Sequence, residues 1–316
     1  MEKLKLGILA VFLALLPAVA FLFYPLKIDP GVVQPSFETT VVEEKQLIPV
    51  LKGENVEQML LEEYIICVLL EEMPATFPVE ALKAQAVVAR TYALRGYTLR
   101  IKHAEAAVCT NHACCQGYRS QEEYLQQGGN REALEFVRNA VEETQGLVVT
   151  YDGKLIDATY FSCSGGATEA AVAVWGADVP YLQSTESPGE EEANHYEDTV
   201  TMGVEKLCSL LGLPVATVPG ELLGQVSYTE GGGVDTMVIG GRTFTGVQLR
   251  SALGLRSTAI TIEITGTTVH ITTRGYGHRV GMSQYGARAM ALEGKSYTDI
   301  LNHYYKDIAI ITYAID

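Results

Sequence analysis

"LLEEMPATFPVEALKAQAVVARTYA", residues 69–93, decides how this chain folds, because two prolines interrupt an otherwise helical stretch. Before it, apolar residues recur at helical spacing from residue 56 to 73, which predicts an amphipathic helix with some strand character at its start. Pro74 ends that helix, since the residue before a proline is driven out of the helical conformation. Pro78 is well tolerated in a first helical turn, so we expect a second helix from there to about Arg100.

Two adjacent glutamates, Glu71 and Glu72, stand where the first helix ends. The negative end of the helix dipole, a neighbouring like charge and burial would each raise the pKa of such a carboxyl. A carboxylic acid that stays protonated near neutral pH can donate its proton to a glycosidic oxygen. Glutamates at helix ends are also common and mostly solvated, so the alternative is an inert, solvated pair.

The rest of the chain mixes helical and hairpin patterns without a repeated strand–helix–strand unit. "LVVTYDGKLIDATYF", residues 147–161, predicts a hairpin whose turn is Asp152-Gly153. Ser283 is a candidate cap for the helix in "SQYGARAMALEG", residues 283–294. Further helices are expected at residues 131–144 and 299–305, and strands at residues 226–245 and 258–273. We therefore expect an α+β fold in which helices and antiparallel hairpins form a substrate groove.

The N-terminal residues predict a membrane anchor. The run from Leu6 to Leu26 is apolar throughout, and about 20 such residues span a bilayer. Lysines precede the run, which favours a cytoplasmic N-terminus. The alternative is a signal peptide cleaved after Ala18-Val19-Ala20, although apolar residues continue past that site. The expected organisation is a cytoplasmic stub and transmembrane anchor at 1–27, an extracytoplasmic linker at 28–50 and one folded domain at 51–316.

Composition restricts the partners and the use of cysteine. The formal net charge of −15 repels phosphates, so we expect no nucleic acid partner. The six cysteines are an even number, and outside the cytoplasm they can form disulfides, but a chain of this size does not need them as a framework. Three of the six lie within residues 109–115, and that clustering suits a metal site better than structural disulfide bonds.

The cysteine-rich segment is "HAEAAVCTNHACCQ", residues 103–116. It offers more than the four ligands that a tetrahedral zinc needs. Cys109 and Cys115 are the strongest candidates, and His103, His112 and Cys114 compete for the other positions. The alternative is a disulfide such as Cys109–Cys115 with incidental histidines.

Two glycine-containing segments are candidates for ligand binding. In "FSCSGGATEA", residues 161–170, Gly165 and Gly166 allow close backbone approach and Ser164 can bond a sugar hydroxyl. In "GYGHRVGMSQYGA", residues 275–287, His278 and Gln284 lie in an unusual loop that leads into a helix. The alternatives are a plain turn for the first segment and a structural histidine in the second.

Several segments resemble the stage II sporulation protein D family, and they occur in that family's order from about Leu60 to Tyr305. The segments are "LEEYIICVLLEEMPATFPVEALKAQAVVARTYA", "CTNHACCQ", "FSCSGGATEA", "VWGADVPYLQS", "LRSALGLRSTAITI" and "GYGHRVGMSQYGARAMA". The resemblance implies a membrane-anchored lytic transglycosylase that acts during forespore engulfment. It would cleave the β-1,4 bond between N-acetylmuramic acid and N-acetylglucosamine in peptide-stripped peptidoglycan strands and leave a 1,6-anhydro end.

The resemblance also implies partners, a location and site residues. The catalytic domain would lie outside the cytoplasm, between the membranes of the sporulating cell, and cooperate with an amidase or endopeptidase and a membrane scaffold. The family's catalytic glutamate precedes Met-Pro, which here is Glu72. Arg90 in "VVARTYA" and Tyr181 in "PYLQS" are implied as groove residues.

A zinc site adjoining the groove is implied as well, with a structural role. His103, Cys109 and Cys115 match the family's ligands by motif position. The family's remaining ligand is typically the histidine before the last cysteine, and this chain has Cys114 there. The fourth ligand is therefore either Cys114 or His112.

Two other functional classes compete with the transglycosylase. A zinc-dependent cell-wall hydrolase or amidase would use Glu72 as a general base beside an open metal, and would release peptide. A non-catalytic glycan-binding protein would change no product at all. Product analysis separates the three classes.

Overall fold

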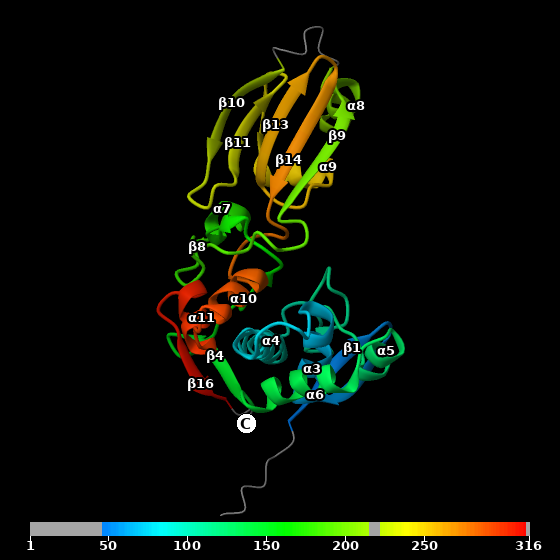
Figure 1. The fold of residues 1–316 in the computed structure, drawn as a ribbon, viewed down its shortest axis with the longest axis vertical. Helices are drawn as coiled ribbons and strands as arrows, with labels where there is room; N and C mark the ends of the chain where they lie inside the picture. Colours follow the sequence, from blue (N-terminus) through cyan, green and yellow to red (C-terminus); the bar gives the residue numbers. More distant parts are fainter. Residues whose placement is uncertain (1–45, 215–221, 314–316) are drawn as a thin grey trace, which may run out of the picture. The chain divides into compact units, whose positions relative to one another are not determined.

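The computed structural model describes residues 46–214 and 222–313 (Figure 1). The anchor expected at residues 1–27, the alternative cleavage site and nearly all of the expected linker lie outside these residues. Among the described residues, no helix has both the length and the apolar character that crossing a membrane requires. Helices and mostly antiparallel strands are mixed along the chain, which confirms the α+β class.

A first hydrophobic core surrounds the longest helix, α4 (Val79–Leu99). Alanines on α4 are fully buried, and their small side chains let other elements pack closely against the helix. Its helical neighbours are α3 (Leu61–Glu72), α6 (Arg131–Glu142), α10 (Gln284–Leu292) and α11 (Tyr297–Tyr304). One small sheet has the strand order β2-β1-β3 and consists of β1 (Leu47–Lys52), β2 (Asn55–Leu60) and β3 (Val108–Cys109). Another small sheet has the strand order β16-β4-β5 and consists of β16 (Ala309–Thr312), β4 (Leu147–Tyr151) and β5 (Lys154–Leu155).

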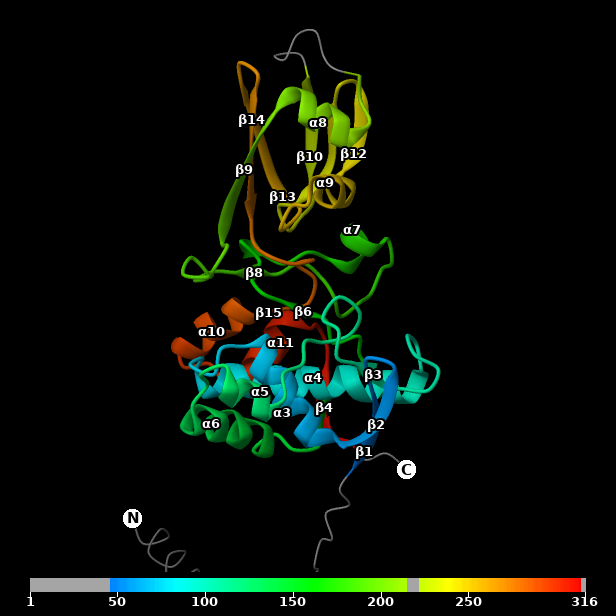
Figure 2. The ribbon, with the colours of Figure 1, turned by 90° about the vertical axis from the view of Figure 1, so that its right-hand side faces the viewer.

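A second core is built from residues 197–274, between the parts of the chain that form the first. Figure 2 shows its strands with two helices beside them. One sheet has the strand order β10-β11-β12 and consists of β10 (Leu223–Tyr228), β11 (Val234–Ile239) and β12 (Arg242–Thr245). The other has the strand order β13-β14-β9 and consists of β13 (Ala259–Thr265), β14 (Thr268–Arg274) and β9 (Glu197–Gly203). Apolar residues of α8 (Val204–Leu211) and α9 (Gly246–Leu253) contribute to the same core.

Short elements connect these parts. β6 (Tyr160–Phe161) pairs in parallel with β15 (Met282–Ser283), and β7 (Gly166–Ala167) pairs with β8 (Glu186–Ser187). The remaining helices are α5 (Gln121–Gln126) and α7 (Ala171–Trp175). The pairing of β6 with β15 matters for the site, because it joins the hairpin after α6 to the start of α10.

Most local predictions are confirmed. The hairpin turn at Asp152 and Gly153 has φ angles of 48° and 72°, and Ser283 caps α10 by accepting from the Gly286 N–H. The first helix begins later than predicted, and the strand character expected at the start of its segment is confirmed. Residues 55–60 form strand β2, which pairs along its length with β1, so the ladder hydrogen bonds replace a helical turn and α3 begins only at Leu61.

A buried ion pair ties the second core to the loops of the first. Arg279 donates to Glu169 at 3.0 Å and to the Gly231 carbonyl. The side chain of Arg279 is only 2% exposed and that of Glu169 only 1%. Glu169 also accepts from the Thr229 hydroxyl and the Gly233 N–H. Gly231 and Gly233 lie in the connection between β10 and β11, so this pair fixes that connection against the segment after β7.

We expect Glu169→Gln to lower the free energy of unfolding by about 3–5 kcal/mol, because it leaves the Arg279 cation buried without a counter-charge. Urea denaturation measures the change. The matched control is Glu197→Gln, which breaks the pair with Arg274, whose side chains are 51% and 63% exposed. The control substitution should lower the free energy of unfolding by less than about 1 kcal/mol. Equal losses of stability in the two variants would contradict the role assigned to the buried ion pair.

Candidate active site

Glu72 is the last residue of α3, as the sequence predicts, and it lies on the wall of a cleft of about 750 Å³. A hollow of about 280 Å³ shares Glu72 and Gln284 with the cleft. A hollow of about 400 Å³ on another side shares Tyr92 and Trp175. The two hollows share lining residues with the cleft, and Glu72 lines both the cleft and the smaller hollow.

The environment of Glu72 favours the protonated carboxyl. Burial raises its pKa, the Gly117 backbone amide and the nearby Tyr160 and Gln284 side chains oppose that rise, and Glu71 adds a little to it. Glu71 itself turns away to an ion pair with Arg119 at 2.6 Å. Burial, not the neighbouring like charge, is therefore the main cause of the raised pKa of this carboxyl.

Gly117 is the closest contact of Glu72. Its N–H donates to the Glu72 Oε1 at 2.5 Å. A Cβ at position 117 would lie 2.9 Å from that oxygen and 2.8 Å from the Glu71 Cγ. Only glycine lets the backbone approach the carboxyl so closely.

A chain of hydrogen bonds leads from the first core to the same carboxyl. The Tyr64 hydroxyl donates to the Gln116 Oε1 at 3.2 Å, and the Gln116 Nε2 donates to the Tyr160 hydroxyl at 3.2 Å. Burial and the Glu72 charge raise the pKa of Tyr160, which keeps its hydroxyl protonated. Because Tyr160 accepts from Gln116, its own proton is available to Glu72.

We expect Tyr160→Phe to raise the pKa of Glu72 further, because the variant loses a donor that stabilises the carboxylate. A ¹³C NMR titration of the carboxyl, assigned by comparison with Glu72→Gln, measures the shift. Tyr304→Phe is the matched control, since this buried hydroxyl bonds to Ser187 instead. A lower pKa in Tyr160→Phe, or an equal rise in the control, would contradict the role of Tyr160.

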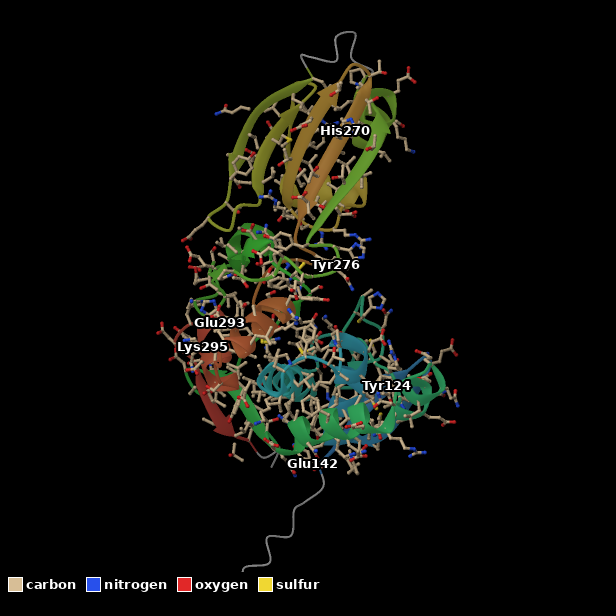
Figure 3. All side chains as sticks on the ribbon, in the orientation of Figure 1. Tyr124, Glu142, His270, Tyr276, Glu293 and Lys295 are labelled. Carbon is tan, nitrogen blue, oxygen red and sulfur yellow. The ribbon has the colours of Figure 1, made fainter. Side chains whose placement is uncertain are left out.

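Aromatic side chains line the cleft. Trp175, the single tryptophan of the chain, is 45% exposed, and Tyr276 is 39% exposed. Tyr276 lies just beyond the end of β14 (Figure 3). Tyr92 and Phe161 also line the cleft. Exposed aromatic faces with a few polar groups among them suit the alternating apolar and hydroxylated surfaces of sugar rings.

Two of the predicted substrate residues, His278 and Gln284, line the cleft. The His278 Nδ1 accepts from the Val280 N–H. Burial first, and then the charge of Arg250, lowers the pKa of His278 to about 4, so the ring is neutral at physiological pH. The Gln284 Nε2 is buried without a hydrogen-bond partner among the described residues and is therefore available to a ligand.

Ser162 of the segment "SCSGG" lines the cleft, whereas Ser164, Gly165 and Gly166 do not. The Ser164 N–H and hydroxyl and the Gly165 N–H all donate to one carboxylate oxygen of Glu190, at 2.6–3.0 Å. Gly165 and Gly166 have φ angles of 76° and 120°, which only glycine adopts without strain. In this structure the turn binds an internal carboxylate, and contact of Ser164, Gly165 and Gly166 with substrate stays a prediction.

Arg90 and Tyr181 also lie away from the cleft. Arg90 is fully buried and pairs with Glu62 at 2.6 Å, and it also donates to the carbonyls of Val141 and Leu147. The Tyr181 hydroxyl accepts from the Asp157 N–H. In this structure both residues bind other parts of the chain, and their role as groove residues stays a prediction.

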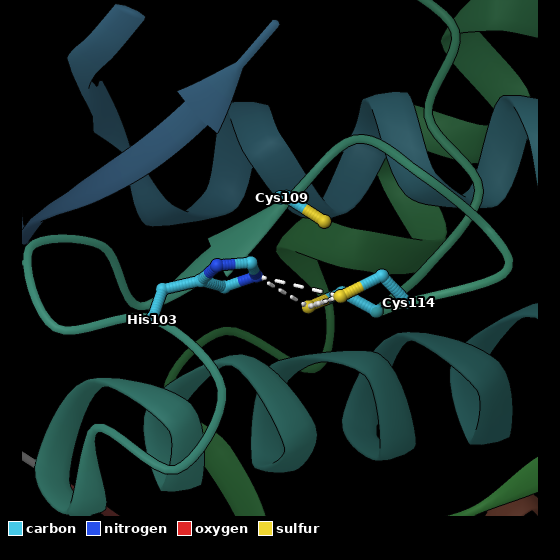
Figure 4. A group of neighbouring side chains, drawn as sticks. His103, Cys109 and Cys114 are labelled. Carbon is cyan, nitrogen blue, oxygen red and sulfur yellow. Dashed lines mark hydrogen bonds between the residues drawn. The ribbon is translucent and has the colours of Figure 1, made fainter. Parts of the chain in front are cut away.

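The cysteine-rich segment gathers the predicted metal ligands. The donor atoms of His103, Cys109, Cys114 and Cys115 all lie within 4.8 Å of one another. His103 Nε2 is 3.6 Å from the Cys114 sulfur and 3.4 Å from the Cys115 sulfur, and the two sulfurs are 3.9 Å apart (Figure 4). Bonds of about 2.3 Å to sulfur and about 2.0–2.1 Å to nitrogen give tetrahedral edges of about 3.5–3.8 Å, so the four residues fit zinc.

The same geometry favours one of the alternatives that the sequence leaves open. All six cysteines are free, so the Cys109–Cys115 disulfide is not formed. Cys114 belongs to the cluster, whereas His112 is exposed outside it. Cys115 also lines the cleft, and the next two residues carry the contacts to Tyr160 and Glu72, so the cluster holds the segment that touches the carboxyl.

Sequence reasoning missed several residues of the cleft. Trp175 was detectable as the single tryptophan of the chain, and Tyr160 as a residue near the end of a predicted hairpin. Arg250 stands in "LRSALGLRSTAITI", a segment that resembles the family, but no local pattern placed it at a cleft, because α9 belongs to the second core and only the folded chain brings this residue there.

Comparisons with known proteins agree with this picture. The family model described as stage II sporulation protein matches residues 52–151. Stage II sporulation protein D of Bacillus amyloliquefaciens is 40% identical over 86% of this chain and 81% of its own length. The protein of the same name from Bacillus subtilis (strain 168) is 40% identical over 83% of this chain and 78% of its own length. The amidase enhancer of Bacillus subtilis (strain 168) is 28% identical over 78% of this chain but only 40% of its own length.

Proposed function

The chain belongs to the stage II sporulation protein D family, and we propose that it is a lytic transglycosylase that cleaves peptidoglycan glycan strands during forespore engulfment. One observation carries the proposal: a single carboxyl with a raised pKa lines an aromatic-lined cleft. Its neighbour Glu71 is neutralised by Arg119. Among the described residues, no second carboxylate of the cleft is left for a two-carboxylate hydrolysis.

The proposed reaction needs only Glu72. Its protonated carboxyl donates to the glycosidic oxygen between N-acetylmuramic acid and N-acetylglucosamine, and the bond from that oxygen to the muramic C1 breaks. The resulting carboxylate accepts the proton of the muramic 6-hydroxyl as that oxygen bonds to C1. Protons and bonds balance without water, and the product is a 1,6-anhydro end. The Gly117 amide and the Tyr160 hydroxyl stabilise the carboxylate between the two transfers.

His103, Cys109, Cys114 and Cys115 would hold zinc beside the groove. A closed set of four protein ligands leaves no position for water, so the metal would be structural. This set disfavours the alternative of a zinc hydrolase, which needs an open position. We also propose, from the family, a single membrane span before the catalytic domain and an amidase partner that strips the strands first.

The test is product analysis with peptide-free glycan strands and the purified full chain. Mass spectrometry should find disaccharides with anhydro ends, lighter by one water than the hydrolysis products. Reducing ends would mean hydrolysis and would direct attention to a second carboxylate. Release of peptide from intact wall would favour the zinc amidase, and no change in any substrate would favour a glycan-binding protein.

A further inference from the structure

Arg250 brings a positive charge from the second core to the cleft. It lies on α9, and it lines the cleft together with Tyr276 and His278. Within residues 46–214 and 222–313, every other arginine that is not exposed pairs with a carboxylate. Arg250 is half-buried and has no carboxylate within ion-pair distance among these residues.

The groups that face Arg250 do not compensate its charge. Tyr276 carries no acidic group of the carboxylate kind, and His278 is neutral because its pKa is lowered to about 4. Glu71 is occupied by Arg119, and burial raises the pKa of Glu72. A guanidinium is always charged, and burying it without a partner is costly, so this position suits a ligand that supplies the anion.

The proposed substrate carries one anion of the right kind. Neutral sugars make up the strand, except that the lactyl ether of muramic acid ends in a carboxylate once its peptide has been removed. The same group is a neutral amide while the peptide remains. A guanidinium binds a carboxylate with two parallel charge-assisted hydrogen bonds, and an amide offers neither the charge nor the second acceptor oxygen.

We propose that Arg250 binds the free lactyl carboxylate of a muramic acid in the cleft and thereby selects peptide-stripped strands. This inference rests on the proposed function, because it takes the glycan strand as the ligand. It adds a residue that distinguishes strands with and without peptide and takes no part in cleaving them. The catalytic carboxyl comes from the first core and the selecting cation from the second, so both cores contribute to one site.

The test measures binding to two matched ligands in a Glu72→Gln background, where the strand stays intact. One ligand is a peptide-free strand with free lactyl carboxylates, and the other is the same strand with those groups converted to methylamides. Arg250→Gln should weaken binding of the carboxylate strand by about 10- to 100-fold, the size of a charge-assisted contact, and leave the methylamide strand unchanged. Arg250→Lys should recover part of the lost binding, because lysine restores the positive charge but cannot donate two parallel hydrogen bonds.

Arg242→Gln is the matched control. This arginine lies in the same second core, donates to the carbonyls of Leu211 and Gly212, and does not line the cleft. It should bind both strands like the parent. Equal loss for both ligands in Arg250→Gln, no loss for either, or a parent that ignores the lactyl charge would overturn the inference. Because binding is measured without turnover, failure of the proposed function shows separately, in the products of the wild-type chain.

Discussion

Glu72→Gln should lower the rate of glycan cleavage by about 10⁴-fold, the upper range for removal of a general acid–base group. Glutamine is nearly isosteric, and its Oε1 can still accept from the Gly117 N–H. It can neither donate a proton to the leaving oxygen nor accept one from the 6-hydroxyl. Since the proposed reaction assigns both transfers to one carboxyl, a single substitution removes both. Rates are measured with peptide-free strands by following the anhydro product.

The same variant should be more stable than wild type near neutral pH. Burial raises the pKa of Glu72 above its ordinary value of 4.5, so the folded protein keeps a proton that the unfolded chain has already lost. Wild-type stability is therefore fully present below pH 4.5, and it falls as pH rises through the folded pKa. Glutamine does not titrate, so the difference in melting temperature should appear at neutral pH and disappear in acid.

Glu71→Gln is the matched control for both measurements. This side chain is exposed and paired with Arg119. It should keep most of the cleavage activity and gain no stability at neutral pH. An inactive Glu71→Gln, or a Glu72→Gln variant that cleaves at a rate close to wild type, would move the catalytic role away from Glu72.

The sequence predicts those parts of the site that depend on local chemistry. Pro74 ends α3 wherever the helix packs, and so Glu72 stands at a helix terminus. His103 and the cysteines near it are close in the chain, so their meeting needs only a short loop. The start of α3 was predicted less well, because residues 55–60 become a strand only when β1 lies beside them.

Roles that depend on tertiary contacts were not predictable from the pattern. Ser164 and its two glycines form the same kind of turn whether it binds a sugar or a carboxylate, and Glu190 occupies it only in the folded chain. Arg90 has the chemistry of a ligand-binding residue, but its guanidinium is buried and its N–H groups donate to Glu62 within the chain. Arg250 shows the reverse case, since its segment resembles the family but no local pattern marks this residue as part of a cleft.

Removal of the metal should cost both stability and activity. Structural zinc sites contribute about 10–16 kcal/mol of apparent binding free energy in small domains, and about 5–15 kcal/mol is the whole stability of a typical protein. In this chain the effect begins in residues 103–117, which the four ligands hold together. Once that segment loosens, the Gly117 N–H no longer meets Glu72 and the contact from Gln116 to Tyr160 is lost. A strong chelator should therefore lower the melting temperature and abolish cleavage, and added zinc should restore both.

Single-ligand variants make this prediction sharper. Cys115→Ser and Cys114→Ser should each lose bound zinc, as measured by metal analysis of the purified chain, and melt at a lower temperature. His112→Ala is the matched control, because its imidazole is exposed and outside the cluster, so it should keep both the metal and the wild-type melting temperature. If His112→Ala lost zinc and Cys114→Ser kept it, the fourth ligand would be His112. If the chelated chain stayed fully folded but inactive, zinc would act in the reaction itself, since a purely structural metal cannot be removed without loosening the segment that holds Glu72.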